Sequence, residues 1–356
     1  MDKSGGIGRL MSYVMDNLQA ASIVIRHVDT RGNNTRPIFS VAPLLAAMSK
    51  IVLLKVTGRV DLVHINISYR GSTIRKCTIA GLCYLIRIPT VLHLHTCEYE
   101  DFFRRLPAPL KYTVRKIFQR ADHVIVLGRV WERFVVHTLG VSETHVTVLY
   151  NAAPGRRPLS GPCKRSGGDV RLLFLGRLGA RKGAPDLLQA LAGLQSDLGW
   201  SITMAGDGDI AGSRKRAQEL GLLDRVTFTG WLDAEQVDDL LESSDVLVLP
   251  SYAEGLPMSV IEAFAHGVAV IATPVGAIPE IVIDGESGLL VPAGDTGALC
   301  DVIQTLCVDA DMRQKLARAG RKMWEKDLDI TEYAVRLSTI WRTVAAHPAV
   351  SASAAG

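Results

Sequence analysis

The sequence predicts an α/β protein of two doubly wound parallel sheets, and three observations support that fold class. The chain has 356 residues, which is long for one α/β domain and comfortable for two. Short apolar runs alternate with helical patterns, which is typical of βαβ units. Residues 153–169 are dense in proline, glycine and basic residues, so they predict a linker between two series of such runs.

The expected strands are short segments rich in β-branched and other apolar residues. The first series comprises Ser22–Val28, Leu62–Ile67, Thr90–His95, His123–Leu127 and Val146–Leu149. The second comprises Val170–Leu175, Ser201–Ala205, Arg225–Thr229, Val246–Pro250 and Val268–Thr273. We therefore expect a domain over residues 1–152 and another over 170–330. A helix over 331–346 should pack back toward the first domain, and residues 347–356 should form a disordered tail.

Charge and cysteine content narrow the class further. The net charge of +4 conceals an excess of basic residues before residue 156. That part of the sequence contains 20 Lys and Arg but only 10 Asp and Glu. This bias favours anionic partners such as phosphates or a membrane surface, although a solvated basic surface would show it as well. Six cysteines without a CxxC pair indicate reduced thiols. Because no apolar run reaches the length of a membrane span, we expect a cytoplasmic protein, soluble or peripheral on a membrane.

The most informative stretch, residues 250–265, follows a strand that is expected to be buried. A helix should begin near Pro257, because proline suits the first helical position. The first amides of that helix, with the helix dipole behind them, can bind a diphosphate at the carboxyl end of a parallel strand. Glu262 falls one to two turns into the helix, where it could accept both hydroxyls of a ribose. Alternatively, Ser259 and Glu262 form a capping box and Glu254 is a solvated loop carboxylate.

A second group of residues, 174–183, follows a strand and precedes a helix expected over Pro185–Leu194. Arg177 and Lys182 lie five positions apart among glycines, so they can place two cations on one pyrophosphate. A solvated basic turn is the alternative. Two Asp-x-Asp pairs follow later in the chain, at 207/209 and 327/329. We expect neither to bind a metal, since the first belongs to a glycine turn and the second to a helical region.

The N-terminus carries a glycine-rich segment with Gly5, Gly6 and Gly8. It predicts a loop between a first strand and a first helix, yet only four residues precede it. We therefore expect the first strand of the first sheet to be missing, as from a truncated start. A nicotinamide-dependent dehydrogenase is a poor alternative, because the full GxGxxG spacing and the acidic ribose-binding residue are absent.

The second half of the chain resembles glycosyltransferase family 4, whose pattern is a glycine turn with Arg and Lys followed by a Glu-x7-Glu motif. Gly176, Arg177, Lys182, Glu254 and Glu262 occur here in that order and spacing. The resemblance extends over residues 5–345. It implies the GT-B fold, in which two Rossmann-like domains face a cleft.

The same resemblance implies roles for individual residues. Arg177 and Lys182 would hold the diphosphate, Glu262 would bind the ribose, and Glu254 would contact the donor sugar. The wider donor-binding set comprises Gly6, Gly8, Gly176, Gly230, Trp231, Leu232, Gly255, Leu256, Met258 and Ser259. Within that set, the backbone of Met258 and Ser259 would cap the phosphate, and Gly230–Leu232 would lie near the base.

The first half of the chain agrees less closely with the family. The strand Pro89–His95 ends where the family carries a histidine near the reacting sugar. Alternation places His93 and His95 on the same face, and His95 lies nearer the loop, so His95 is the catalytic candidate. A core or loop histidine is the alternative. Asn151 matches the hinge asparagine of the family, although Ala152 follows it where the family usually has glycine.

The resemblance implies a retaining, metal-independent transferase that uses no cofactor and binds no nucleic acid. It would move a hexosyl unit from a UDP- or GDP-sugar to a saccharide or polyprenyl-pyrophosphate-linked acceptor, in polysaccharide or glycolipid synthesis. The leaving diphosphate would take up the acceptor proton while the protein stabilises the developing charge. The alternatives are a nucleotide-sugar epimerase or phosphorylase on the same fold, or a non-catalytic nucleotide-binding protein.

Residues 101–120 interleave aromatic residues with six basic ones. Such a segment could hold the first domain against anionic lipid and recruit a lipid-linked acceptor. Equally, it could be a helix that packs Val114, Ile117 and Phe118 into the core and exposes a basic outer face. The sequence leaves both alternatives open.

Overall fold

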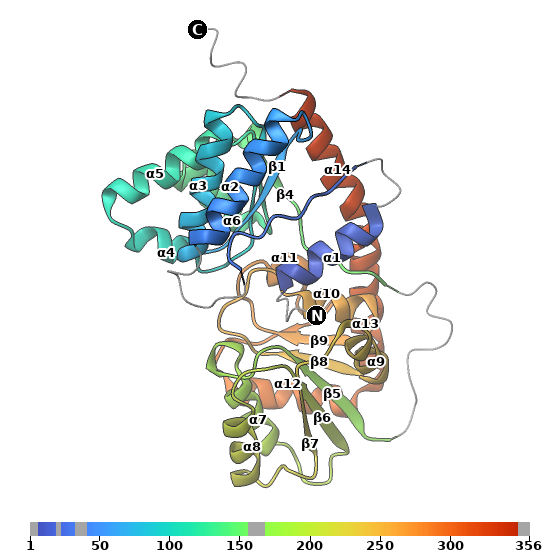
Figure 1. Ribbon diagram of the computed structural model, residues 1–356. Helices are drawn as coiled ribbons and strands as arrows, with labels where there is room; N and C mark the ends of the chain where they lie inside the picture. The colour runs from blue at the N-terminus through green and yellow to red at the C-terminus, as the bar shows by residue number, and fades with distance from the viewer. Residues whose placement is uncertain (1–5, 19–22, 33–40, 156–167, 348–356) are drawn as a thin grey trace. The chain divides into compact units, whose positions relative to one another are not determined.

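The computed structural model describes residues 6–18, 23–32, 41–155 and 168–347 (Figure 1). It contains two compact units. Unit 1 comprises Met1–Tyr150 and Tyr333–Gly356, and unit 2 comprises Asn151–Glu332. Each unit holds one parallel sheet with helices, in agreement with the α/β class that the sequence predicts.

The sheet of unit 1 has the order β1-β2-β3-β4, and all neighbouring strands are parallel. Its strands are β1 (Val63–Ile67), β2 (Thr90–Leu94), β3 (His123–Val126) and β4 (Val146–Val148). Every residue of β2 is buried, because both faces of the strand are covered. Four of the five strands predicted for this half are therefore present.

The helices of unit 1 precede the first strand, connect the strands or, in the case of α14, follow unit 2 in the sequence. They are α1 (Gly6–Leu18), α2 (Val41–Val56), α3 (Gly71–Leu85), α4 (Tyr99–Arg105), α5 (Ala108–Arg120), α6 (Arg129–Arg133) and most of α14 (Ile330–Ala346). A π-helical turn, η2 (Phe134–Thr138), continues α6, and the 3-10 turn η3 (Glu143–His145) precedes β4. On α5, Val114 and Phe118 are buried while Leu110 and Tyr112 are exposed, so its inner face packs in the core.

Two expectations about the N-terminal residues are wrong. A strand was expected at Ser22–Val28, but residues 23–28 form no strand, and Ser22 lies outside the described residues. Val24 in this segment is 77% exposed, so its apolar side chain has no sheet to cover it. The glycine loop is also replaced, because Gly6 and Gly8 lie in the first turns of α1. Leu10, Val14 and Leu18, four residues apart, form the buried stripe of that helix, and helical periodicity prevails over the glycines.

Unit 2 has a six-stranded parallel sheet in the order β10-β9-β8-β5-β6-β7. Its strands are β5 (Val170–Leu175), β6 (Trp200–Ala205), β7 (Val226–Gly230), β8 (Val246–Leu249), β9 (Ala269–Ala272) and the unpredicted two-residue β10 (Leu289–Leu290). The chain first builds outward from β5 to β7 and then returns to pair β8 with the other edge of β5. This reversal is a topological switch point, where open α/β sheets bind ligands.

Helices α7 to α11 connect the strands of unit 2, and α12 and α13 follow its last strand. They are α7 (Ala184–Ala192), α8 (Ile210–Glu219), α9 (Ala234–Ser243), α10 (Met258–Ala265), α11 (Ile278–Ile281), α12 (Thr296–Val308) and α13 (Ala310–Met323). The 3-10 turn η4 (Ala180–Lys182) precedes α7, and the π-helical turn η5 (Trp324–Leu328) follows α13. Among the described helices of the whole chain, none is both long enough and apolar enough to cross a membrane.

Candidate functional site

Two loops of unit 2 meet at the switch point between β5 and β8. The β5–α7 loop carries Arg177 and Lys182, and the β8–α10 loop carries Glu254. The amide of Tyr252 donates to the carbonyl of Arg181 at 2.9 Å, and Nη1 of Arg181 donates to the carbonyl of Ala253 at 2.8 Å. These bonds hold together two segments that lie 72 positions apart in the sequence.

Glycines make this close approach possible. Gly183 has a φ of +70°, and a Cβ at this position would overlap the carbonyl oxygen of Pro250. Gly276 has a φ of +60°, and a Cβ there would overlap the carbonyl oxygen of Glu254. Any larger residue at either position would strain its own backbone and displace the β8–α10 loop.

An ion pair joins the two loops. Nζ of Lys182 donates to Oε1 of Glu254 at 2.5 Å, and the two side chains are only 14% and 7% exposed. The stem of Lys182 passes Gly176, whose missing Cβ would lie 3.5 Å from Cε of the lysine. Glu254 is therefore not the solvated loop carboxylate that the sequence left open as an alternative.

The helix after the β8–α10 loop starts one residue later than expected. Pro257 is the N-cap residue, with φ −71° and ψ 129°, and it contributes no side-chain hydrogen bond to the first turn. Ser259 lies inside α10, so the capping-box alternative is wrong. All eight residues of α10 are buried, including Glu262 at 3% exposure. The start of α10 thus presents backbone amides and a helix dipole without a side-chain cap.

Arg177 has a different environment from Lys182. Its side chain is exposed, and no hydrogen bond or ion pair joins its guanidinium to any residue that the structure describes. The loop around it is fixed, since the amide of Leu178 donates to the carbonyl of Asp207 at 2.7 Å. A Cβ on Gly208 would lie 2.9 Å from Cγ of Arg177, which places the arginine stem beside that glycine.

The glycine turns after β5, β6 and β7 lie side by side at the same edge of the sheet. The amide of Gly176 donates to the carbonyl of Ala205 at 2.9 Å, and that of Gly206 donates to the carbonyl of Gly230 at 2.8 Å. Trp231, directly after β7, is 42% exposed. The candidates Gly230 and Trp231 therefore lie at the same edge of the sheet as Gly176, and Leu232 comes next in the chain.

One aspartate of each Asp-x-Asp pair binds a backbone amide. Asp209 is the N-cap of α8 and accepts a hydrogen bond from the amide of Gly212 at 2.9 Å. Asp329 accepts one from the amide of Thr331 at 2.7 Å. In the described ranges, no three side chains of His, Cys, Asp or Glu gather closely enough to hold a metal ion.

Asn151, the first residue of unit 2, is bonded to the β8–α10 loop. Its Nδ2 donates to the carbonyl of Leu256 at 2.7 Å, and the side chain is buried. Sequence reasoning assigned Asn151 to a hinge and missed this bond. The contact spans 105 positions, so no local pattern could have predicted it.

In unit 1, His95 follows β2, and its amide donates to the carbonyl of Ile67 at 3.0 Å. The rings of His93 and His95 have centroids 3.8 Å apart, which confirms that the two side chains share one face. A third histidine, His64 of β1, lies with its ring centroid 5.4 Å from that of His93. Sequence reasoning missed this cluster.

A chain of hydrogen bonds orients these rings. Nε1 of Trp341, on α14, donates to Nδ1 of His64 at 3.0 Å. Because indole is only a donor, Nδ1 of His64 must be the acceptor, and its Nε2–H then donates to Oδ1 of Asn66 at 3.2 Å. Nε2 of His95 donates to the same oxygen at 2.7 Å. The network therefore leaves Nδ1 of His95 as the unprotonated nitrogen.

Burial keeps this cluster neutral. It lowers the pKa of His64 to about 4 and that of His95 to about 3. Burial also lowers the pKa of His93, with further contributions from the two neighbouring histidines, and neither ring nitrogen of His93 has a hydrogen-bond partner among the described residues. At neutral pH, His95 can therefore accept a hydrogen bond but carries no charge. The signal that could have revealed Asn66 as the partner of His95 is its position near the end of β1, the strand that pairs with β2.

Comparison with known proteins gives matches along most of the chain. Residues 14–154 match the family model described as Glycosyltransferase Family 4, and residues 162–323 match the model described as Glycosyl transferases group 1. The glycogen synthase of Mycobacterium tuberculosis is 28% identical over 282 residues, which are 74% of this chain. The chain spans 63% of the length of that relative.

Solved structures share the fold over both units. Sucrose-phosphate synthase from Thermosynechococcus elongatus aligns with a TM-score of 0.75 at 22% identity, over 96% of this chain and 94% of its own. Anabaena HepE in complex with UDP-glucose aligns with a TM-score of 0.73 at 18% identity, over 96% and 97%. The expected GT-B fold is thereby confirmed. The chain belongs to the group 1 glycosyltransferases, with an N-terminal part of the family 4 type.

Proposed function

We propose that this chain transfers a hexosyl unit from a nucleotide diphosphate sugar to a saccharide or lipid-linked acceptor. The observation that supports this most directly is the Lys182–Glu254 pair, held at 2.5 Å where the loops of β5 and β8 meet. It combines a cation with a carboxylate beside the uncapped start of α10. A diphosphate with an attached sugar carries the charges and hydroxyls that complement these groups.

The proposed donor is a UDP- or GDP-sugar. The complex of HepE with UDP-glucose supports UDP by analogy. Lys182 and Arg177 would neutralise the leaving diphosphate, and the first amides of α10 would bind its oxygens. Glu262, within α10, would bind the ribose, and Glu254 would contact the sugar. Trp231 and its neighbours would lie near the base.

Transfer is proposed to proceed with retention and without a metal ion. The acceptor hydroxyl would attack from the face that the diphosphate leaves, and the diphosphate would take the proton. Charge on the leaving group would then be stabilised by Lys182, Arg177 and the helix dipole. For His95 we propose that its unprotonated Nδ1 accepts a hydrogen bond from a sugar hydroxyl, a role that suits a neutral ring.

A thermal-shift screen of UDP- and GDP-sugars, followed by transfer assays with the stabilising donor, tests this proposal. We expect one nucleotide sugar to raise the melting temperature and to yield a product with the anomeric configuration of the donor by NMR, unaffected by EDTA. Inversion or loss of activity with EDTA would contradict the mechanism. Donor binding without transfer to any acceptor would indicate a non-catalytic protein, and phosphate-dependent cleavage would indicate a phosphorylase.

The acceptor and the cellular place are also proposals. We propose a saccharide or polyprenyl-pyrophosphate-linked acceptor and a peripheral position on the inner face of the cell membrane. The exposed side of α5, within residues 101–120, supports this with exposed Arg115 and Arg120 on the same helix as exposed Leu110 and Tyr112. Salt-sensitive flotation with anionic vesicles is the expected result, and its absence would remove this part of the proposal.

A further inference from the structure

Trp341 lies at the far end of the hydrogen-bond chain that reaches His95. Its buried indole packs against His64 of the same unit, with ring centroids 5.5 Å apart and an interplanar angle of 78°. Nε1 of Trp341 donates to Nδ1 of His64 at 3.0 Å. From there the chain runs through the amide of Asn66 to Nε2 of His95. Two side chains thus separate the indole from the catalytic candidate.

The amide of Asn66 could serve the two imidazoles in two ways. With its oxygen toward the rings, it accepts from Nε2 of His64 at 3.2 Å and from Nε2 of His95 at 2.7 Å. With the amide turned around, its two N–H groups would donate to the same two nitrogens, and both rings would carry their proton on Nδ1. The shape of an asparagine amide permits either arrangement. Because both rings contact the same atom, the tautomers of His64 and His95 are coupled.

The indole of Trp341 excludes the turned arrangement. In that arrangement the proton on Nδ1 of His64 would point at the indole N–H, whose nitrogen lies 3.0 Å away, so two donors would face each other. An indole has no acceptor and cannot adapt to this change. Burial also lowers the pKa of His64 to about 4, so the ring does not take a second proton near neutral pH. Only the arrangement with the oxygen of Asn66 toward the rings satisfies every donor.

We propose that Trp341 is a positioning residue: its indole N–H, acting through the two intervening side chains, keeps the proton of His95 on Nε2. The unprotonated Nδ1 of His95 then accepts a hydrogen bond from a ligand hydroxyl or amide N–H. It disfavours a carboxylate or phosphate oxygen at the same place, because two acceptors would face each other. The effect on transfer rests on the function proposed above for His95, whereas the tautomer itself does not.

Nitrogen-15 NMR of the full chain with labelled histidine tests the proposal, at a pH of about 8 where the rings are neutral. Protonated and unprotonated ring nitrogens resonate in separate ranges. The signals of His95 are identified among the nine histidines by their loss in His95→Gln. The wild type should show His95 with its proton on Nε2 only. Trp341→Phe removes the indole donor and keeps an aromatic ring, so both tautomers of His95 should become populated.

Replacing Asn66 by aspartate provides a rescue. A carboxylate can only accept hydrogen bonds, so it holds the proton on Nε2 of both rings with or without the indole. The double variant Trp341→Phe/Asn66→Asp should therefore return the proton of His95 to Nε2. A loss of packing around residue 341 would not be repaired by this change, because asparagine and aspartate have nearly the same size and shape.

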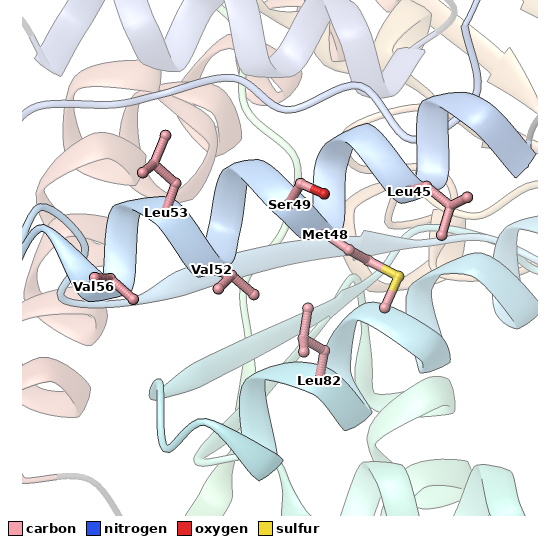
Figure 2. A pocket seen from close by; sticks show the side chains of 7 residues that line it. All are labelled: Leu45, Met48, Ser49, Val52, Leu53, Val56 and Leu82. Atoms are coloured by element: carbon pink, nitrogen blue, oxygen red, sulfur yellow. The ribbon is translucent and has the colours of Figure 1, made fainter.

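Two control variants match the parts of this change. Trp324→Phe removes a comparable indole bond, from Nε1 to the carbonyl of Ala153 at 3.0 Å, but in unit 2. Met48→Ala removes apolar packing from unit 1 at the groove between α2 and α3, where Figure 2 shows Met48 directed toward Leu82. Both controls should leave the ring signals of His95 as they are in the wild type.

The transfer assay gives a second readout. With the donor that the thermal-shift screen identifies, kcat/KM of Trp341→Phe should fall in proportion to the population that keeps Nδ1 of His95 unprotonated, about twofold when the two tautomers are equal. A wild-type spectrum with the proton of His95 on Nδ1 would overturn the proposal, whether or not any variant folds. An unchanged single tautomer in Trp341→Phe would overturn it as well, and failure of the aspartate rescue would refute the route through Asn66. A wild-type chain with the expected tautomer but no transfer would contradict only the proposed function.

Discussion

At the scale of single residues, the Lys182–Glu254 pair has the sharpest energetic consequences. Two opposite charges that are almost fully out of water roughly balance their desolvation by attracting each other. Removing one partner leaves an uncompensated buried charge, which costs about 3–5 kcal/mol in measured cases. The same residues are our candidates for contact with the donor, so stability and activity should respond together at these positions.

Replacing Glu254 should lower both activity and stability. Glu254→Ala should lower transfer by about 10²–10³-fold, because a preorganised polar contact to the donor is lost. It should also lower the free energy of unfolding while the circular dichroism spectrum stays native. Glu286→Ala, at an exposed loop glutamate of the same unit, is the control and should be neutral. Near-normal turnover by Glu254→Ala would refute the assignment of that residue.

The histidine cluster predicts an acid dependence of stability. Burial lowers the pKa of His64 to about 4 and of His95 to about 3, against about 6.5 in the unfolded chain. The unfolded state therefore binds more protons below pH 6.5, so the free energy of unfolding should be constant above that pH and fall as the pH drops toward 4. Urea denaturation between pH 7.5 and about 4.5 measures this slope.

His93→Leu tests the source of that slope. His93 is fully buried and its ring nitrogens have no partner among the described residues, so an apolar side chain of similar size should stabilise unit 1 by about 1 kcal/mol at neutral pH. The free energy of unfolding of the variant should also depend less on pH between 6.5 and 4, because the variant lacks the lowered pKa of His93. An unchanged slope would show that His93 does not take part in the acid response.

At the scale of elements, the approach of the β5–α7 loop to β8 depends on Gly183. Gly183→Ala should destabilise unit 2 and weaken donor binding, since the new Cβ overlaps the carbonyl of Pro250 and shifts Lys182. Gly221→Ala is a matched control. It has the same φ of +70°, but a Cβ there meets nothing within 4 Å. The control should lose only about 1 kcal/mol of stability, which is the cost of placing alanine in the left-handed conformation, and its donor affinity should be unchanged.

The elements also show what a sequence can predict. Buried strands such as β2 and β8 were foreseen because short, mostly apolar runs rich in valine and leucine are typical of buried strands in a parallel sheet. Residues 23–28 have a similar composition, yet they form no strand, because strand formation depends on a partner that composition does not encode. In the same way, the bond from Asn151 to Leu256 and the network through Asn66 join distant segments. The candidate residues were readable, but their partners were not.

At the scale of the whole molecule, the candidate donor-binding residues in the second half of the chain all belong to one unit. Lys182, Glu254 and Glu262 all lie in unit 2. Calorimetry should therefore show that UDP shifts the melting of unit 2 and leaves that of unit 1 in place, if the two units melt separately. At a hundred times the dissociation constant the expected stabilisation is about 2.7 kcal/mol. A uniform shift of all transitions would mean that the units unfold as one.

The order in which the two units are completed during synthesis follows from the path of the chain. Unit 2 is one uninterrupted segment, whereas unit 1 is completed by α14, most of which follows unit 2 in the sequence. The bond from Trp341 to His64 spans 277 positions. On the ribosome, the second unit can fold while the first still lacks its final helix. Deletion of the last seventeen described residues should therefore leave a nascent product whose early half stays open to chaperones and proteases.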